Sequence, residues 1–350
     1  MIPLKREAHM RNHPSRKCHF LQADNRLRPN ELRTHLKCQE WASINMLSLK
    51  IKKLKRITRN ALSHFYHTPT LNLESRFLGG VAAIKSQRSN YRYLSDIRQA
   101  EVRVFSQNGE DGILDYIFET CGLIKPSILE IGSGDFSECN SKFSNFLRNS
   151  AVYLVDSHEG LSQIYDKYRS RRVNSKFFFE RLWIDKSNVL QVFWRAKEKL
   201  GNVDVLSLDI DGNDYWILCR LPLSELEVLV VEYNPSLSDC EPVSTVYDPH
   251  FDRTKKHFSC KYYGATLEAF DYLLSSNGFF FLGATSQGTN AFFVKNRHKE
   301  SFGGVIKNLN SYKNTDSREA RDEKGALSFV DIDLERQILK SLPVVDVRKS

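Results

Sequence analysis

The chain has 350 residues, of which 41% are hydrophobic and 27% charged, so it is long enough for one large α/β domain with extensions. No stretch approaches the roughly 18 to 20 apolar residues of a membrane span, and the first residues lack the apolar region of a secretory signal, so we expect a cytoplasmic protein. The seven cysteines are odd in number and form no CxxC pair, so neither a disulfide framework nor a zinc site is indicated.

The net charge of +9 belongs to one end of the chain. Residues 1 to 60 contain 15 basic and 4 acidic side chains, whereas the other 290 residues contain 36 basic and 38 acidic ones. A nucleic-acid groove would need clustered positive charge on the folded part. We therefore expect no nucleic-acid partner.

The N-terminal region divides into an arm and a helical segment. Residues 1 to 45 show no sustained hydrophobic period, which predicts a basic, disordered arm, and Met46 is a candidate start. Over residues 47 to 65 apolar residues recur at helical spacing with six basic residues between them, which predicts a basic amphipathic helix within a helix-and-linker segment at 46 to 95. Such a helix either contacts an anionic membrane surface peripherally or, more often, packs on its own domain.

The most informative stretch is residues 127 to 136, in which an apolar run carries Glu130 and ends in Gly132 and Gly134. Glycine permits a tight turn and lets the backbone approach a ligand closely. A dinucleotide site usually has a third glycine, where this chain has Ser137. An acid two residues before the first glycine instead suits a cationic ligand such as S-adenosylmethionine. The alternative is a strand-to-helix turn that binds nothing.

Two further apolar strands end in acids. A strand at 151 to 155 ends at Asp156, which lies 26 residues after Glu130, where doubly wound folds hold a ribose diol. A third strand, predicted over 177 to 184, ends at Asp185, a position that commonly faces an adenine amine.

The fourth and fifth strands also deliver polar side chains. The fourth begins at Val203 and runs into Asp209 and Asp211, and the fifth begins at Leu226 and runs into Glu232 and Asn234. Acids at this edge are costly unless they bind a cation or do chemistry. Alternatively, Asp209 and Asp211 cap the next helix.

These strands, with helices at 188 to 200 and 266 to 276, define the expected fold. The fold class is α/β, a doubly wound, Rossmann-like, seven-stranded, mostly parallel sheet, closed by an antiparallel hairpin of strands at 279 to 282 and 290 to 294. The domain is expected over 96 to 300. Residues 301 to 350 are expected to form a peripheral tail with one helix at 334 to 342.

Several of these segments resemble FkbM-type S-adenosylmethionine-dependent methyltransferases, a class I, Rossmann-like superfamily. The similar motifs are residues 130 to 134 (EIGSG), 207 to 212 (SLDIDG) and 230 to 232 (VVE). Residues 106 to 111 (SQNGED) and 290 to 294 (NAFFV) are similar to a bacterial subgroup of unassigned substrate. The resemblance covers residues 100 to 296 and departs from many members at Asp135 and Phe136, where they have a further small residue.

The resemblance implies a set of roles for binding S-adenosylmethionine. Glu130 would pair with the methionine amino group, Gly132 and Gly134 would admit it, Asp156 would hold the ribose, Asp185 would contact the adenine, and Gln107 would close the pocket. The protein would then methylate a hydroxyl of a small-molecule or saccharide acceptor, such as a sugar or polysaccharide precursor.

Two mechanisms and two rival functions stay open. A carboxylate of Asp209, Asp211 or Glu232 can act as general base, or Asp209, Glu232 and Asn234 can hold Mg²⁺. The sequence Asp209-Ile210-Asp211 is also a DxD pattern, typical of glycosyltransferases that use a sugar nucleotide and a divalent metal. A non-catalytic Rossmann-like binding module is the third interpretation.

Overall fold

The computed structural model describes residues 68–160, 176–238, 241–312 and 320–349. The predicted arm, Met46 and the amphipathic helix at 47 to 65 lie outside the described residues. The chain divides into two units, 1–71 and 72–350, and the fold below is that of the second. Within the described ranges no helix is long and apolar enough to cross a membrane.

A seven-stranded sheet forms the centre of the domain, in the order β3-β2-β1-β4-β5-β8-β7. Its strands are β1 (Ile128–Ile131), β2 (Val152–Asp156), β3 (Phe177–Arg181), β4 (Val205–Leu208), β5 (Val228–Glu232), β7 (Phe279–Ala284) and β8 (Asn290–Lys295). Strands β1 to β5 pair in parallel, and β8 is antiparallel to both β5 and β7. The predicted doubly wound α/β fold with a C-terminal hairpin is confirmed.

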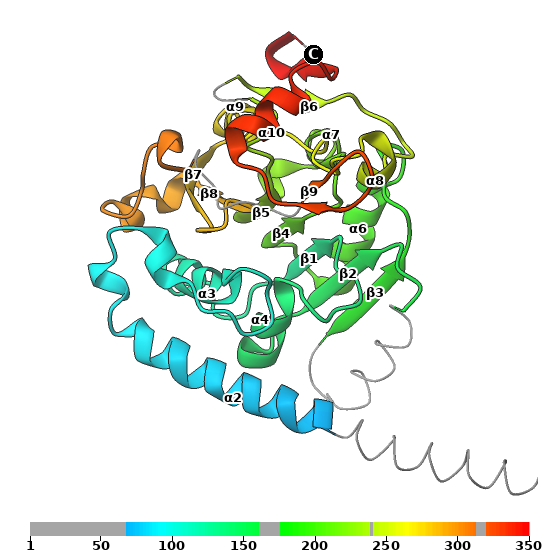
Figure 1. The fold of residues 1–350 in the computed structure, drawn as a ribbon. Coiled ribbons are helices and arrows are strands. Elements are labelled where there is room, and N and C mark those ends of the chain that lie inside the picture. The colour runs from blue at the N-terminus through cyan, green and yellow to red at the C-terminus, as the bar shows by residue number, and fades with distance from the viewer. Residues whose placement is uncertain (1–67, 161–175, 239–240, 313–319, 350) are drawn as a thin grey trace, which may run out of the picture. The chain divides into compact units, whose positions relative to one another are not determined.

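Helices cover both faces of the sheet (Figure 1). The helices are α2 (Thr68–Arg88), α3 (Glu110–Cys121), α4 (Ser141–Arg148), α6 (Val189–Leu200), α7 (Asp214–Leu218), α8 (Arg253–Lys256), α9 (Leu267–Ser275) and α10 (Ile332–Leu339). Figure 1 shows α3 and α4 on one face and α7 and α9 on the other. Short 3-10 turns occupy Tyr91–Tyr93, Ile97–Ala100, Leu223–Glu225, Asn296–Phe302, Leu309–Tyr312 and Val347–Lys349. Helix α2 lies where the sequence predicted the linker before the domain.

Local sequence explains where several elements end. Helix α6 ends at Gly201, which has a φ of +93°, a conformation that glycine adopts without steric cost. Helix α9 begins after Thr266, whose hydroxyl accepts a hydrogen bond from the N–H of Ala269. Strand β3 ends at Arg181, three residues before the predicted end at 184.

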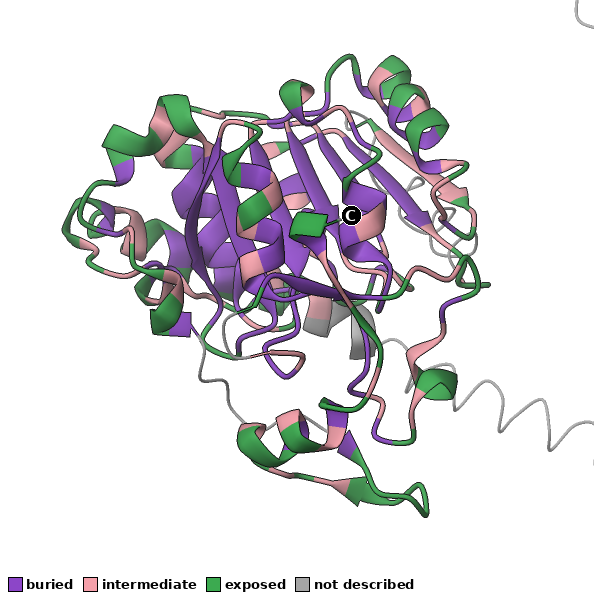
Figure 2. Ribbon diagram, turned by 90° about the horizontal axis from the view of Figure 1, so that it is seen from above, coloured by how far each residue is buried: buried purple, intermediate pink, exposed green. Residues whose placement is uncertain are grey.

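The strands carry most of the core. All residues of β1, β4, β5 and β7 are buried, including Phe279, Phe280 and Phe281. Figure 2 shows the buried strands enclosed by helices whose outer faces are exposed. Four cysteines in the described ranges are free thiols, as expected, at positions 121, 139, 219 and 260.

The C-terminal residues pack on a loop of the domain. Strand β11 (Val344–Asp346) pairs antiparallel with β6 (Val243–Thr245), and β9 (Ala320–Arg321) pairs with β10 (Leu327–Ser328). On α10, Glu335 is buried and lies 2.9 Å from the Lys261 ammonium. The C-terminal residues that the sequence predicted as a tail therefore pack beside residues 257 to 263, through the pair of Lys261 and Glu335.

Candidate functional site

The parallel register places four residues at the carboxyl ends of the central strands in one row. Ile131 pairs with Val155 on β2 and with Leu208 on β4, and Leu208 pairs with Val231 on β5. The next residues along these strands therefore lie side by side at the carboxyl edge, and they are Asp156, Gly132, Asp209 and Glu232. Ligands of open α/β sheets bind at this edge.

Two glycines after β1 serve different purposes. Gly132 has a φ of +91°, and a Cβ there would lie 1.5 Å from the carbonyl oxygen of Asp209. Gly134 also has a positive φ of +54°, but apart from its chain neighbours no described atom lies within 4 Å of the place where its Cβ would be. Gly132 is thus required for packing of the turn on β4, whereas Gly134 leaves a side of the turn open.

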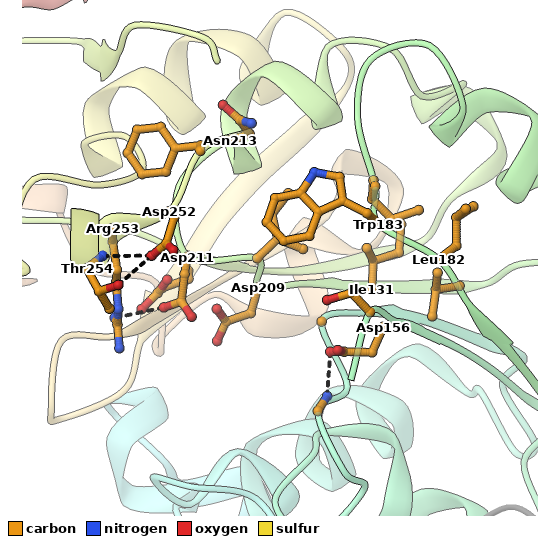
Figure 3. Close-up of a pocket in the computed structure, with 18 of the residues that line it drawn as sticks. Ile131, Asp156, Leu182, Trp183, Asp209, Asp211, Asn213, Asp252, Arg253 and Thr254 are labelled. Carbon is orange, nitrogen blue, oxygen red and sulfur yellow. Dashed lines mark hydrogen bonds and ion pairs between the residues drawn. The ribbon is translucent and has the colours of Figure 1, made fainter. Parts of the chain in front are cut away.

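A cavity of about 560 Å³ opens at this edge of the sheet, within the size range of small-molecule sites. We call it the acidic cavity, because its lining includes five carboxyl groups and one guanidinium, those of Asp156, Asp209, Asp211, Glu232, Asp252 and Arg253. Gln107, Gly132 and Gly134 also line it, together with the apolar side chains of Ile131, Val155, Leu182, Trp183 and Ile184. Figure 3 shows Asp209 between Asp156 on one side and the pair of Asp211 and Arg253 on the other.

Three acids at the ends of β4 and β5 form a cluster. One carboxylate oxygen from each of Asp209, Asp211 and Glu232 lies within 4.8 Å of the others. Burial, together with the nearby charge of Glu232, raises the pKa of Asp209 well above its ordinary value. Nη1 of Arg253 lies 2.7 Å from Oδ1 of Asp211. The cluster can accept a proton, or offer the oxygen ligands that Mg²⁺ prefers.

The loop after β4 is held by Asp214 rather than by the cluster acids. The carboxylate of Asp214 accepts hydrogen bonds from the N–H groups of Ile210 and Gly212, each 2.9 Å long. Asp211 lies between them with a φ of +56°, a conformation unusual outside glycine. Burial raises the pKa of Asp214 to about 7. This bonding holds the loop on which Asp211 lines the cavity. The residue before α7 is Asn213, whose side chain makes no capping hydrogen bond to the helix.

A carboxylate also fixes the loop that carries Gln107. Oδ2 of Asp111 accepts hydrogen bonds from the N–H groups of Val104, Phe105 and Ser106, at 2.6 to 2.8 Å. The neighbouring Glu110 accepts from the Nδ2 of Asn290 at the start of β8, 2.7 Å away. The loop is thus tied to the sheet, and Gln107 reaches the acidic cavity.

Three predicted site residues do not line the acidic cavity. Glu130 is buried and accepts hydrogen bonds from the N–H groups of Asn140 and Ser141, at 2.7 and 3.0 Å, at the start of α4. Asp185 accepts from Ser187 and Asn188 at the start of α6. These acids hold helix starts, a use of strand-end carboxylates that sequence alone does not separate from ligand binding.

Asn234 is likewise directed elsewhere. Its Nδ2 donates to the carbonyl oxygens of Lys261 and Tyr263, at 2.8 and 2.9 Å, and its Oδ1 accepts from the N–H of Ser236. The structure brings Asp209 and Glu232 together with Asp211, and leaves Asn234 out of the cluster.

The sequence analysis did not identify the residues of the returning segment 251 to 254. Asp252, Arg253 and Thr254 line the cavity, and Trp183 donates from Nε1 to the carbonyl oxygen of Pro249 at 2.8 Å, which holds the segment over the strand ends. The only local signal is Asp252 as the N-cap of α8, where it accepts from the N–H of Thr254. That signal predicts a short helix but not its place.

The strand order, with its one antiparallel strand, is that of the class I methyltransferase fold expected above. No protein-family model matches the chain, and no curated protein matches it. Among solved structures, the chain is similar to the magnesium protoporphyrin IX methyltransferase ChlM from Synechocystis PCC 6803 with bound S-adenosylmethionine, at 14% identity over 53% of this chain and 77% of that one, with a TM-score of 0.35.

Two further solved structures are similar to a comparable extent. The N-terminal domain of EvdMO1 with bound S-adenosylhomocysteine is 12% identical over 55% of this chain and 82% of that one, with a TM-score of 0.36. The CurJ carbon methyltransferase is 11% identical over 63% and 67%, with a TM-score of 0.32. Similarities of this size carry no argument about function, which has to depend on the residues of the site.

Proposed function

We propose that this chain is an S-adenosylmethionine-dependent methyltransferase. The observation that supports the proposal most is the charge of the acidic cavity, with five carboxyl groups against one guanidinium at the carboxyl edge of the sheet. S-adenosylmethionine carries a sulfonium and an amino cation, so such a lining suits it. A sugar nucleotide carries a diphosphate, which the same carboxylates would repel unless a metal intervened.

The residues of the cavity suggest how the ligand is held. Gly134 would let the methionine part approach the backbone, and Asp156 would accept hydrogen bonds from the ribose hydroxyls. Asp156 already accepts from the N–H of Gly134 at 2.7 Å and from the N–H of His158 at 2.7 Å, which orients its carboxylate. Leu182 and Ile184 would form an apolar wall for the adenine. Glu130 would act indirectly, by holding the start of α4 behind the glycine turn.

Methyl transfer needs positioning and a place for one proton. S-adenosylmethionine supplies a methyl group already activated on a sulfonium. Transfer of that methyl group to an acceptor hydroxyl would release the hydroxyl proton, which a residue of this chain would have to accept. We propose that Asp209 accepts it, because it lies in the cavity between Asp156 and Asp211 and its pKa is raised. Asp211 and Arg253 would orient the acceptor.

A divalent cation is the second arrangement that the cluster suggests. Asp209, Asp211 and Glu232 would hold Mg²⁺ through one oxygen each, and Asp211 here takes the place expected for Asn234. The bound ion would lower the pKa of an acceptor hydroxyl. As the acceptor itself we propose a hydroxyl of a sugar or polysaccharide precursor, on the resemblance noted in the sequence.

Calorimetry with S-adenosylhomocysteine tests the proposal. Binding to the wild type is expected, with affinity lowered by about tenfold to a hundredfold in Asp156→Ala, since a hydrogen bond to a charged group contributes about 1.5 to 3 kcal/mol. Asp185→Ala is the control for Asp156→Ala, because Asp185 lies outside the cavity in the loop after β3, and the affinity of this variant is expected to be unchanged.

A panel of UDP- and GDP-sugars with Mg²⁺ addresses the rival functions. Binding of a sugar nucleotide without S-adenosylhomocysteine would replace the proposal by a glycosyltransferase that uses Asp209 and Asp211. Binding of neither ligand would indicate a non-catalytic module.

A further inference from the structure

A second cavity adjoins the acidic one. It has a volume of about 380 Å³, again within the range of small-molecule sites, and Gln107, Arg253 and Thr254 line both cavities. We call it the basic cavity, because three of the residues that line it are cationic, Arg253, Lys261 and Arg321. Among the described residues that line it, none is acidic.

The charged residues that line the two cavities are therefore mostly acidic in one and basic in the other, and Gln107, Arg253 and Thr254 line both. The acidic cavity presents five carboxyl groups, and Arg253 is the cation at its boundary with the basic cavity. A molecule that extends from one cavity into the other would meet carboxylates at one end and cations at the other. A ligand that is cationic throughout or anionic throughout would not suit both ends.

The cations of the basic cavity are held in place by protein groups. Lys261 is buried with its ammonium 2.9 Å from Oε1 of Glu335, and the guanidinium of Arg321 donates to the carbonyl oxygen of Gly325 at 3.0 Å. Arg253 pairs with Asp211 and lies over the ring of Tyr263, 5.5 Å from its centroid. Cations whose positions are fixed before binding lose little conformational entropy when an anion arrives. A guanidinium also matches phosphate and carboxylate with parallel N–H donors.

The rest of the lining suits a hydroxylated molecule. Gln107, Thr254 and Thr289 offer donors and acceptors, and Tyr263 offers an aromatic face. Thr254 and Gln107 lie at the shared wall, so a hydroxyl bound there would be close to the carboxylates of the acidic cavity.

We infer that the basic cavity binds the methyl acceptor, and that this acceptor carries an oxyanion, a phosphate or a carboxylate, in addition to the hydroxyl that is methylated. Methylation of that hydroxyl rests on the proposed function, whereas binding of the oxyanion does not. The inference narrows the acceptor from a saccharide in general to an acidic or phosphorylated one.

Calorimetry with four probes tests the inference. Inorganic phosphate, glucose 6-phosphate, glucuronate and neutral glucose are titrated into the full chain, with and without S-adenosylhomocysteine. We expect at least one anionic probe to bind about tenfold or more tightly than glucose, as one charge-assisted contact would give. Preference for glucose 6-phosphate would identify a phosphate, and preference for glucuronate a carboxylate.

Arg321→Gln is the test variant, because the side chain is exposed on β9 and its loss is not expected to unfold the domain. Its affinity for the anionic probe should fall about tenfold, whereas Arg220→Gln, at an exposed arginine that lines neither cavity, should leave it unchanged. Cys260 lines the basic cavity and Cys219 does not. The anionic probe should therefore slow maleimide labelling of Cys260 and leave that of Cys219 unaltered.

The outcomes separate the inference from the proposed function. If S-adenosylhomocysteine binds but no anionic probe binds better than glucose, the inference is wrong and the proposed function stands. If an anion binds and protects Cys260 while S-adenosylhomocysteine does not bind, the basic cavity is an anion site and the proposed methyltransferase function is wrong. Equal affinities of the wild type and Arg321→Gln for the anion would also overturn the inference.

Discussion

Replacing Gly132 with alanine tests whether the end of β1 is built by direct contact with the end of β4. A Cβ at this position would lie 1.5 Å from the carbonyl oxygen of Asp209, and the two would have to separate by about 2 Å to reach an ordinary contact. Overpacking of this kind costs about 1 to 3 kcal/mol, and a positive φ in alanine costs a further 1 to 2 kcal/mol or so. We expect a loss of about 2 to 5 kcal/mol, or roughly 4 to 20 °C in Tm.

Gly134→Ala is the matched variant for the same thermal-unfolding assay. It carries the positive-φ cost alone, about 1 to 2 kcal/mol, because its Cβ would meet open space. Because this cost is small, the variant should stay folded. Because Gly134 lines the acidic cavity, the added methyl group should lower the affinity for S-adenosylhomocysteine. Equal Tm values for the two alanine variants would refute the reasoning, since the contact with Asp209 would then have no energetic effect.

Three further predictions concern carboxylates. Asp111→Ala should lower the free energy of unfolding by about 3 kcal/mol or more in urea titrations, because three buried N–H groups lose their acceptor, whereas Asp135→Ala, at an exposed turn, should cost less than about 1 kcal/mol. The folded-state pKa of Asp214 is raised to about 7, so the native state binds more protons than the unfolded state above about pH 4, and stability should fall as pH rises toward neutrality. Asp214→Asn should flatten that slope in urea midpoints measured between about pH 5 and pH 8, and an unchanged slope would contradict the assignment. If the cluster holds a metal, electron paramagnetic resonance should detect Mn²⁺ bound to the wild type, and Asp211→Asn should weaken that binding. Equally weak binding of Mn²⁺ by the wild type and the variant would leave the arrangement in which Asp209 is the general base.

The fold and the row of residues at the sheet edge were predictable from sequence because they depend on short-range patterns. Each central strand is an apolar run that ends in a charged residue or glycine, and parallel pairing then aligns those ends without further information. Asp156, Asp209 and Glu232 meet at one cavity for this reason. The hairpin of β7 and β8 followed equally from two apolar runs with a short link.

The same reasoning did not predict the hydrogen-bond partners of Glu130, Asp185 and Asn234. An acid at a strand end can face a ligand or accept the first N–H groups of the next helix, and the two uses have the same local sequence. Here the start of α4 turns its N–H groups onto Glu130, and the start of α6 does the same to Asp185. The choice depends on loop geometry that the sequence pattern does not contain.

The place of Arg253 and Lys261 at the cavities could not be predicted from the sequence for a different reason. They lie in a polar segment of the sequence with no hydrophobic period, Arg253 on the short helix α8 and Lys261 after it. Contacts with residues distant in sequence hold this segment, such as the hydrogen bond from Trp183 to Pro249 and the pair of Lys261 and Glu335. Because these contacts join residues that are far apart in sequence, the residues that line the basic cavity cannot be recognised before the tertiary contacts are known.

The pair of Lys261 and Glu335 has a practical consequence for how the protein is handled. A version trimmed to residues 96 to 300 would keep the seven strands of the central sheet and yet lose α10, so the buried Lys261 ammonium would lose its ion pair with Glu335, and the basic cavity would lose the strand that carries Arg321. If the proposed function holds, such a fragment would lack part of the acceptor site, so a substrate screen run on it could miss the true acceptor.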